Sequence, residues 1–196
     1  DAVPLDDPRM DEWRDSLKRG VQAHHKPTGF TVSGGVDDVW VNPQGELIVV
    51  DYKATSKNAK IEQLDQEWHE GYKRQMEIYQ WLFRQNGFKV SSTGYFVYAN
   101  ADKDKEAFDG VLEFELTLIP YIGDDAWVEG TLLEIKKVLD SGELPDAAPL
   151  CDYCKYREVV GKKMLAFAGK TKSAQGRSAS GGKSVEEPSS SGTLGI

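Results

Sequence analysis

Asp37, Asp51 and Lys53 are the residues of this chain whose types and spacing could do chemistry, because they combine two carboxylates with an amine. Positions 42–45 read Asn-Pro-Gln-Gly, an order typical of a type I turn that ends in a left-handed glycine. This turn predicts a β-hairpin in which Asp37 faces Asp51, and the two-residue period of a strand places Lys53 on the face of Asp51. Two carboxylates that converge from adjacent strands suit a hard cation such as Mg²⁺.

The register of the hairpin decides whether these side chains meet. Counting back from the turn predicts two apolar cross-strand pairs on the same face, Val41 with Leu47 and Val39 with Val49. Asp38 points to the other face. Like charges in direct opposition are destabilising, so a cation is expected between the acids, and Lys53 could order or deprotonate a metal-bound water or neutralise a transition state at phosphorus. The alternative is a structural acid pair neutralised by Lys53, and a register shift of one residue would move Asp37 to the face of Asp38.

Hydrophobic periodicity outlines the elements that must position the hairpin. We expect a short helix at 11–20, a strand at 30–33 leading into the hairpin, a long helix at 61–86, strands at 93–100 and 111–120, and a helix at 127–139. Along the long helix, one face is defined by side chains at spacings of three and four, namely Trp68, Tyr72, Gln75, Tyr79 and Leu82. This order of elements predicts an α/β fold, in which a mixed central β-sheet is flanked by helices.

Three short motifs occur in an order that resembles a known family. They are Gly34-Gly35-Val36-Asp37 for G-x-x-D, Asp51-Tyr52-Lys53 for D-x-K, and Gln75-Met76-Glu77-Ile78-Tyr79 for Q-x-x-x-Y. With a strand, a turn, a strand and a helix between them, they resemble the RecB-type exonuclease branch of the PD-(D/E)XK nuclease superfamily, from Phe30 to Arg157. The resemblance implies a restriction-endonuclease-like core and an Mg²⁺- or Mn²⁺-dependent nuclease. Such an enzyme hydrolyses phosphodiester bonds of DNA by metal-activated water, in DNA repair among other pathways.

The resemblance also implies roles for individual residues. The catalytic and metal-binding set would be Asp37, Asp51 and Lys53, with the backbone carbonyl of Tyr52 as a further metal ligand. Gln75 and Tyr79 would bind the substrate. Without the resemblance, a tyrosine on an apolar helical face is more simply explained as part of the core.

A further metal ligand is expected upstream of the hairpin. Members of this family often use a histidine there, or an acid of the first helix, and His25 and Glu12 occupy those places in this chain. The alternative for His25 is a histidine in a solvated loop.

Cys151 and Cys154 form a C-x-x-C pair. Two thiols cannot complete a tetrahedral metal site, so within this chain we expect free, reduced cysteines. Some RecB-type nucleases use four cysteines around an iron-sulfur cluster or a zinc ion, and this pair could be part of such a site only if further cysteines precede Asp1. The absence of an initial Met suggests a truncated start. A redox pair is less expected, because such motifs normally follow a strand and open a helix in a thioredoxin-like unit.

Length and composition predict one globular domain with a tail. The chain has 196 residues, of which 39% are hydrophobic. We expect an N-terminal helix and linker at 1–29, the nuclease-like domain at 30–168, and a disordered Ser/Gly-rich tail at 169–196. With no signal peptide and no apolar run near the ~20 residues that a membrane span needs, a cytoplasmic protein without membrane contact is expected.

The net charge of −8 argues against nonspecific binding of duplex DNA, which normally relies on patches of Lys and Arg. This acidity favours a DNA substrate reached as an end or a single strand, or a partner protein that supplies a basic surface. It also favours an alternative function, a catalytically silent nuclease-fold domain that binds nucleic acid or a partner protein. A small-molecule metalloenzyme on another fold is disfavoured, because the chain has no histidine-rich ligand set.

Overall fold

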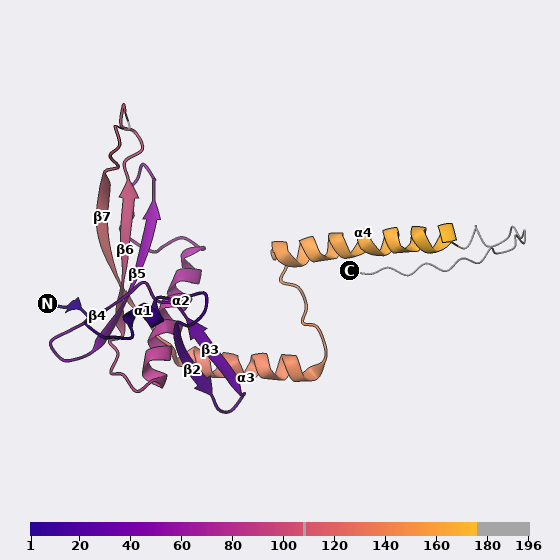
Figure 1. Cartoon of the computed structure of the whole chain (residues 1–196), viewed down its shortest axis with the longest axis horizontal. Helices are drawn as coiled ribbons and strands as arrows, with labels where there is room; N and C mark the ends of the chain where they lie inside the picture. Colours follow the sequence, from indigo (N-terminus) through magenta and orange to yellow (C-terminus); the bar gives the residue numbers. More distant parts are fainter. Residues whose placement is uncertain (108, 176–196) are drawn as a thin grey trace, which may run out of the picture. The chain divides into compact units, whose positions relative to one another are not determined.

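The computed structural model describes residues 1–107 and 109–175 (Figure 1). The chain divides into two compact units, Asp1–Glu143 and Leu144–Ile196. In the second unit, α4 (Asp152–Gln175) crosses position 168, where the sequence predicts the domain to end, and the rest of the predicted tail, 176–196, lies outside the described residues. No described helix is both long enough and apolar enough to cross a membrane.

The first unit is built on a mixed sheet of five strands. Their order is β1 (Val3–Pro4), β4 (Asp38–Val41), β5 (Leu47–Thr55), β6 (Thr93–Ala101) and β7 (Phe114–Ile122). Only β5 and β6 are parallel neighbours among these strands. The remaining elements are a separate hairpin, β2 (Val21–His25) with β3 (Phe30–Gly34), and the helices α1 (Met10–Trp13), α2 (His69–Gln85) and α3 (Ala126–Ser141). The predicted α/β fold with a mixed central sheet flanked by helices is confirmed.

The hairpin of β4 and β5 has the predicted register. Val41 pairs with Leu47 and Val39 with Val49. In the turn, the N–H of Gly45 donates to the carbonyl of Asn42 at 2.9 Å, and Gly45 has φ of +73°, a conformation that glycine adopts without steric cost. The turn sequence therefore determines which β5 side chains face α2.

The N-terminal helix is shorter than the sequence predicts. The Asp15 carboxylate accepts hydrogen bonds from the backbone N–H groups of Leu17 and Lys18, which turns the chain soon after Trp13. As a result Trp13 is buried, whereas Leu17, four residues later within the predicted helix, is 92% exposed. Residues 1–29 also contribute β1 and β2, so they belong to the folded unit and are not a linker to it.

The long helix starts eight residues later than predicted. Residues 61–68 run as an irregular segment in which Ile61 and Leu64 pack against the core, so apolar contacts there do not require a helix. The ring of His69 accepts a hydrogen bond from the N–H of Gln66 at 3.1 Å, before the first turn of α2. At the other end Gly87 adopts φ of +82° and stops the helix, as the sequence predicts.

The core lies between one face of the sheet and α2, which also contacts β2 and β3. Residues from both layers are fully buried, including Val49 and Phe96 from the sheet and Leu82 and Phe83 from α2. Burying each large apolar side chain contributes about 1.5–3 kcal/mol, so this layer holds α2 against the strands that carry the acids.

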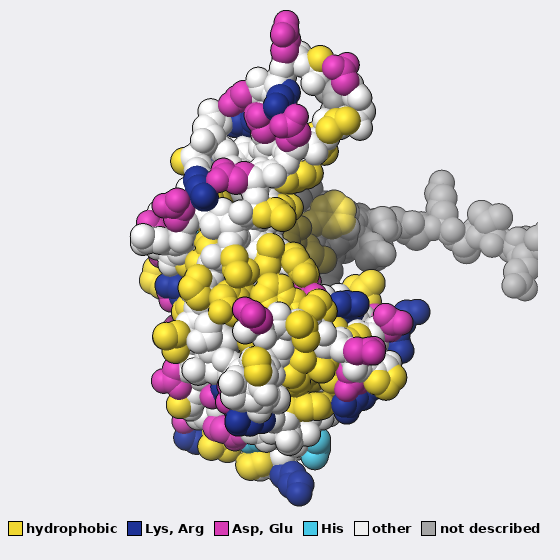
Figure 2. All heavy atoms as spheres, turned by 90° about the vertical axis from the view of Figure 1, so that its left-hand side faces the viewer, with side chains coloured by type: hydrophobic (Ala, Val, Ile, Leu, Met, Phe, Trp, Pro, Cys, Tyr) yellow, Lys and Arg dark blue, Asp and Glu magenta, His cyan; other side chains and the backbone are white. Residues whose placement is uncertain are grey.

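The opposite face of the sheet carries exposed apolar side chains. On β7 the buried Ile119 points into the core, and the side chains of the other face are exposed. The exposed apolar set is Phe114, Leu116, Leu118 and Ile122. Leu118 pairs with Val97, and Val97 with Tyr52, so this surface continues across three strands. Figure 2 shows hydrophobic side chains gathered on this side of the molecule.

Candidate active site

The hairpin brings Asp37 and Asp51 to the same end of the sheet. Asp51 lies in β5 with 4% of its surface exposed, whereas Asp37 precedes β4 and is exposed. The ladder has Asp38 opposite Val50, so the next position along it sets Asp37 against Asp51. Asp37 Oδ2 accepts a hydrogen bond of 2.8 Å from the backbone N–H of Tyr52. One carboxylate is therefore anchored to the backbone beside the other.

Opposing effects set the protonation of Asp51. Burial raises its pKa above the usual value and is the largest influence; Lys53 lowers the pKa, and the negative charge of Asp37 raises it. Lys53 Nζ lies 2.6 Å from Asp51 Oδ2, yet this buried oxygen receives no well-directed hydrogen bond from the described residues. Lys53 therefore compensates the acid pair only in part.

The two carboxylates fit a divalent cation that retains open coordination positions. Mg²⁺ is usually held by one or two carboxylates, with waters and substrate phosphate completing its shell. Asp37 and Asp51 supply that number, and Asp51 Oδ2 lacks a well-directed donor among the described residues. Across residues 1–107 and 109–175, no group of three or more His, Cys, Asp or Glu side chains is arranged to hold a metal ion. A cation bound here would face water and substrate.

Lys53 is held between the sheet and α2. Its amine lies 4.1 Å from the ring centroid of Tyr72 and 3.5 Å from Gln75 Oε1, in addition to the contact with Asp51. The sequence places Tyr72 on the face of Gln75 but assigns it no role. The signal that would have identified it is its position one helical turn from Gln75 on the face turned toward Lys53.

Gln75 connects Lys53 to Tyr79. Gln75 Nε2 donates to the Tyr79 hydroxyl at 2.8 Å, and Tyr79 is 8% exposed. Burial raises the pKa of Tyr79, although the Gln75 hydrogen bond lowers it, and the nearby carboxylates add to the increase. A Cβ atom at Gly34 would lie 2.5 Å from Tyr79 Cε1, so only glycine fits there. The structure thus brings together all three motifs.

Asp38 lies on the other side of β4, as predicted, and it is nearly buried. It accepts hydrogen bonds from Arg14 at 2.7 Å and from the Tyr52 hydroxyl at 3.1 Å. Arg14 also donates to the backbone carbonyl of Asp37 at 3.0 Å. The sequence does not reveal the role of Arg14, because the contact spans more than twenty residues and no motif links its two ends.

The structure does not bring His25 and Glu12 to the carboxylates. Both ring nitrogens of the buried His25 are engaged, one with Thr28 Oγ1 at 2.8 Å and the other with Glu129 Oε2 at 2.7 Å. Glu12 is exposed and lines a small pocket with residues of the α2 C-terminal end, including Asn86. Among the described residues, neither joins a metal-ligating group.

The cysteines lie in the second unit, at the start of α4. Both are free and half-buried. The N–H of Cys154 donates to Cys151 Sγ at 3.4 Å, and hydrogen bonds from Cys154 lower the pKa of Cys151. The pair forms no metal-ligating group with other described residues.

Comparison with known proteins yields one strong match. The family model described as the PD-(D/E)XK nuclease superfamily matches residues 6–159, most of the chain. No curated protein matches. A solved structure described as "Crystal structure of SSO0001" is 21% identical, covering 71% of this chain and 55% of that one, with a TM-score of 0.38. This chain thus spans about half the length of that protein, and the likeness is too low to carry an argument. On the extent of the family match, the chain belongs to the PD-(D/E)XK nuclease superfamily, whose members are typically metal-dependent nucleases.

Proposed function

We propose that the chain is a nuclease that hydrolyses phosphodiester bonds of DNA with Mg²⁺ or Mn²⁺, as a RecB-type member of its superfamily. The observation that carries this proposal is the buried Asp51, set against Asp37 and only partly compensated by Lys53 at 2.6 Å. Like charges that face each other across a hairpin destabilise the fold unless a cation lies between them. Such a pair is therefore typical of a functional site.

Asp37, Asp51 and the backbone carbonyl of Tyr52 would hold the ion in this proposal. When bound, such an ion lowers the pKa of a water molecule and polarises a phosphoryl oxygen. The N–H of Tyr52 holds Asp37 in place at 2.8 Å, so the same residue orients one carboxylate and offers its carbonyl.

Lys53 and the α2 side chains would act on the substrate. The Lys53 amine, held over Tyr72, places a positive charge where negative charge develops on the phosphate, or orients the attacking water. Gln75 orients both Lys53 and Tyr79, because its Oε1 accepts from the Lys53 amine and its Nε2 donates to the Tyr79 hydroxyl. The Tyr79 hydroxyl is protonated at neutral pH, as that of an ordinary tyrosine is, and its proton can be donated to a phosphate oxygen.

A second candidate is a nuclease-fold domain that binds nucleic acid or a partner protein without cutting. The net charge of −8 favours it, because a free-standing nuclease normally attracts DNA with basic surface. A partner with a basic surface would compensate for this acidity.

Cleavage of labelled single-stranded DNA in Mg²⁺ and in EDTA tests the proposal. We expect wild-type cleavage only with the metal, and at least a hundredfold loss in Asp51→Asn and in Lys53→Ala. Asp11→Asn, at an exposed aspartate of α1, is the matched control and should cleave as the wild type does. Wild-type cleavage that persists in excess EDTA, or full activity in Asp51→Asn, would overturn the proposal. Calorimetric Mg²⁺ uptake that is lost in Asp37→Asn would argue against the silent-domain alternative.

A further inference from the structure

Trp68 is a large aromatic side chain that is half-exposed to solvent. It lies at the N-terminal end of the α2 face that carries Tyr72 and Gln75. It directly precedes the first residue of α2 and is 47% exposed. Its ring meets that of Tyr72 edge to face, with centroids 5.4 Å apart, and Tyr72 in turn contacts Lys53. A line of contacts therefore runs from the proposed active site to an exposed indole.

A second lysine lies on Trp68 as Lys53 lies on Tyr72. Lys57 Nζ is 4.7 Å from the Trp68 ring centroid, and Lys53 Nζ is 4.1 Å from that of Tyr72. Trp68 and Tyr72 are four residues apart, about 6 Å along a helix axis, and the two lysines are also four residues apart in sequence, with Lys57 two residues beyond the end of β5. Two lysine–aromatic pairs therefore lie beside the acids, Lys53 with Tyr72 and Lys57 with Trp68.

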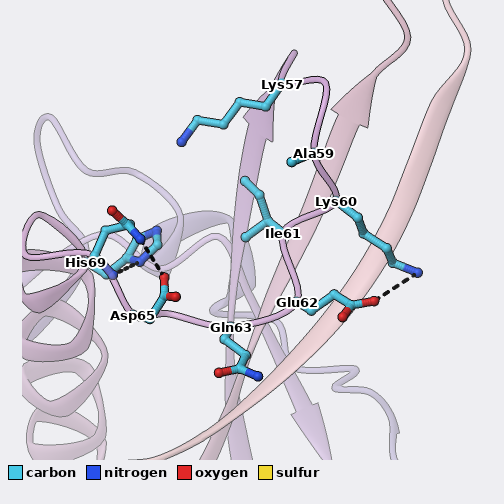
Figure 3. A pocket seen from close by; sticks show the side chains of 9 residues that line it. Lys57, Ala59, Lys60, Ile61, Glu62, Gln63, Asp65 and His69 are labelled. Atoms are coloured by element: carbon cyan, nitrogen blue, oxygen red, sulfur yellow. Dashed lines mark hydrogen bonds and ion pairs between the residues drawn. The ribbon is translucent and has the colours of Figure 1, made fainter.

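A pocket adjoins this pair. Its volume is about 400 Å³, and it is lined by residues of the segment 57–66 and by His69 (Figure 3). The His69 ring also contacts that of Trp68. The volume lies within the usual range of ligand sites. Lys60, also in the lining, is paired with Glu115 at 2.9 Å, and its side chain points away from His69 in Figure 3.

His69 supplies an independent sign that the pocket takes a ligand. It is 2% exposed, and its Nδ1 accepts a hydrogen bond from the N–H of Gln66 at 3.1 Å. The proton of the neutral ring must therefore lie on Nε2. Nε2 is buried and has no partner among the described residues, although buried donors are almost always paired. Because Nε2 is covered here, an acceptor atom of a bound molecule would satisfy it once the side chains that cover it move aside.

We propose that Trp68, Lys57 and His69 form a subsite for one unpaired nucleotide of single-stranded DNA, next to the phosphodiester bond at the acid pair. The base stacks on the Trp68 ring in place of Lys57, which moves from the ring to the attached phosphate, and His69 Nε2–H donates to an acceptor of the nucleotide. The inference rests on the proposed nuclease function and names its substrate class.

Stacking explains why the substrate would be a single strand. In a duplex the base faces are covered by neighbouring bases, whereas in a single strand they are free to stack on an aromatic ring. Stacking on one ring is worth about 1–3 kcal/mol, which is about 5- to 140-fold in affinity. An acidic protein that gains little from phosphate attraction would depend on this contribution.

Fluorescence anisotropy with a labelled 12-nucleotide oligothymidine, and with a duplex of equal length, tests the subsite in EDTA, where metal-dependent cleavage does not occur. We expect Trp68→Ala to weaken single-strand binding at least fivefold, Trp68→Phe to restore most of it, and duplex binding to change less than twofold. Lys57→Ala should weaken binding and flatten its salt dependence. Tyr156→Ala, which removes an exposed ring from α4, is the matched control.

Two results would overturn the subsite. One is single-strand binding by Trp68→Ala as tight as that of the wild type, and the other is an equal loss for single strand and duplex. Because Trp68 is half-buried against His69 and Tyr72, the unfolding midpoint of each variant is measured as well, and this check separates lost binding from lost fold. If the wild type fails to cleave in Mg²⁺ but its single-strand binding depends on Trp68, the subsite stands and the proposed cleavage falls.

Discussion

At the residue scale, Asp51 combines burial with a charge that only its neighbours can compensate. Burial is the larger influence and raises the pKa of Asp51, so the folded protein holds the proton of this group more tightly than the unfolded chain does. Above the usual carboxyl pKa of 3.8, ionised Asp51 therefore reduces the stability of the metal-free fold. A residue that costs stability at neutral pH is more easily explained by function than by packing.

The Asp51→Asn variant should show this cost directly. In EDTA at pH 7 we expect it to be at least as stable as the wild type, by about 0–2 kcal/mol, because an amide needs no compensating charge. Its advantage should shrink as the pH falls, because the raised pKa of Asp51 lets the folded wild type take up this proton at a pH above the usual 3.8. Urea unfolding of both proteins between pH 4 and 7 measures the difference. A variant that is markedly less stable at pH 7 would show that the Asp51–Lys53 ion pair stabilises the fold.

Gly34 shows at the same scale how one atom fixes a functional side chain. A methyl group there would lie 2.5 Å from Tyr79 Cε1, closer than two carbon atoms can approach without a shift. Gly34 does not have a positive φ, so backbone conformation does not require a glycine there. Close packing against Tyr79 does. Gly34 of G-x-x-D and Tyr79 of Q-x-x-x-Y therefore pack closely against each other.

At the element scale, Glu77 ties α2 to the far strand and to α3. Its buried carboxylate accepts hydrogen bonds from the Tyr121 hydroxyl at 2.5 Å, from Trp127 Nε1 at 2.7 Å and from the N–H of Asp124 at 3.3 Å. Three donors of three different types thus depend on one residue. The burial that excludes water here also raises the pKa of Tyr121.

We expect Glu77→Ala to destabilise the protein by about 2–5 kcal/mol, because it leaves buried donors without an acceptor. Glu77→Gln keeps one acceptor oxygen and should cost less. Lys73→Ala, one turn earlier on α2 at a surface pair with Glu70, is the control and should change stability by under about 1 kcal/mol. Chemical denaturation of the three variants provides the comparison. Equal stability of Glu77→Ala and the wild type would show that these hydrogen bonds contribute nothing.

The elements that the sequence predicts best are those whose cause is local. The hairpin register follows from the turn at 42–45, and the end of α2 follows from Gly87. The start of α2 could not be predicted, because the apolar residues Ile61 and Leu64 fit a helical pattern but reach the core from an irregular segment.

The candidate site was predictable to the same extent. Asp37, Asp51 and Lys53 meet through one local turn, but the contact of Arg14 with Asp38 and that of His25 with Glu129 join distant segments. A spacing rule cannot anticipate such pairs, since they arise only when separate elements pack together. This is why the sequence offers His25 as a candidate ligand and the structure engages both of its ring nitrogens elsewhere.

At the scale of the whole molecule, the buried cluster lies entirely in the first unit, from Met10 to Leu132. A protein ending at Glu143 should therefore unfold cooperatively, with an urea midpoint close to that of the full chain. A protein ending at Asp125 is the matched control: it lacks α3, with buried Val128 and Leu132, and should be strongly destabilised. Circular dichroism during urea titration gives the midpoints. A chain ending at Glu143 that fails to fold would show that residues beyond it complete the core.

The apolar face of the sheet along β7 has a consequence for how the protein behaves in solution. Contiguous exposed apolar surface promotes self-association, and like charge on every molecule opposes it. Here that opposition comes from the net charge of −8, which disappears near the isoelectric point of about 5.0. The same acidity that weakens attraction to DNA therefore keeps the molecules apart in solution. The protein should stay dispersed only at pH values and salt concentrations where charge repulsion between molecules exceeds the attraction between their apolar faces.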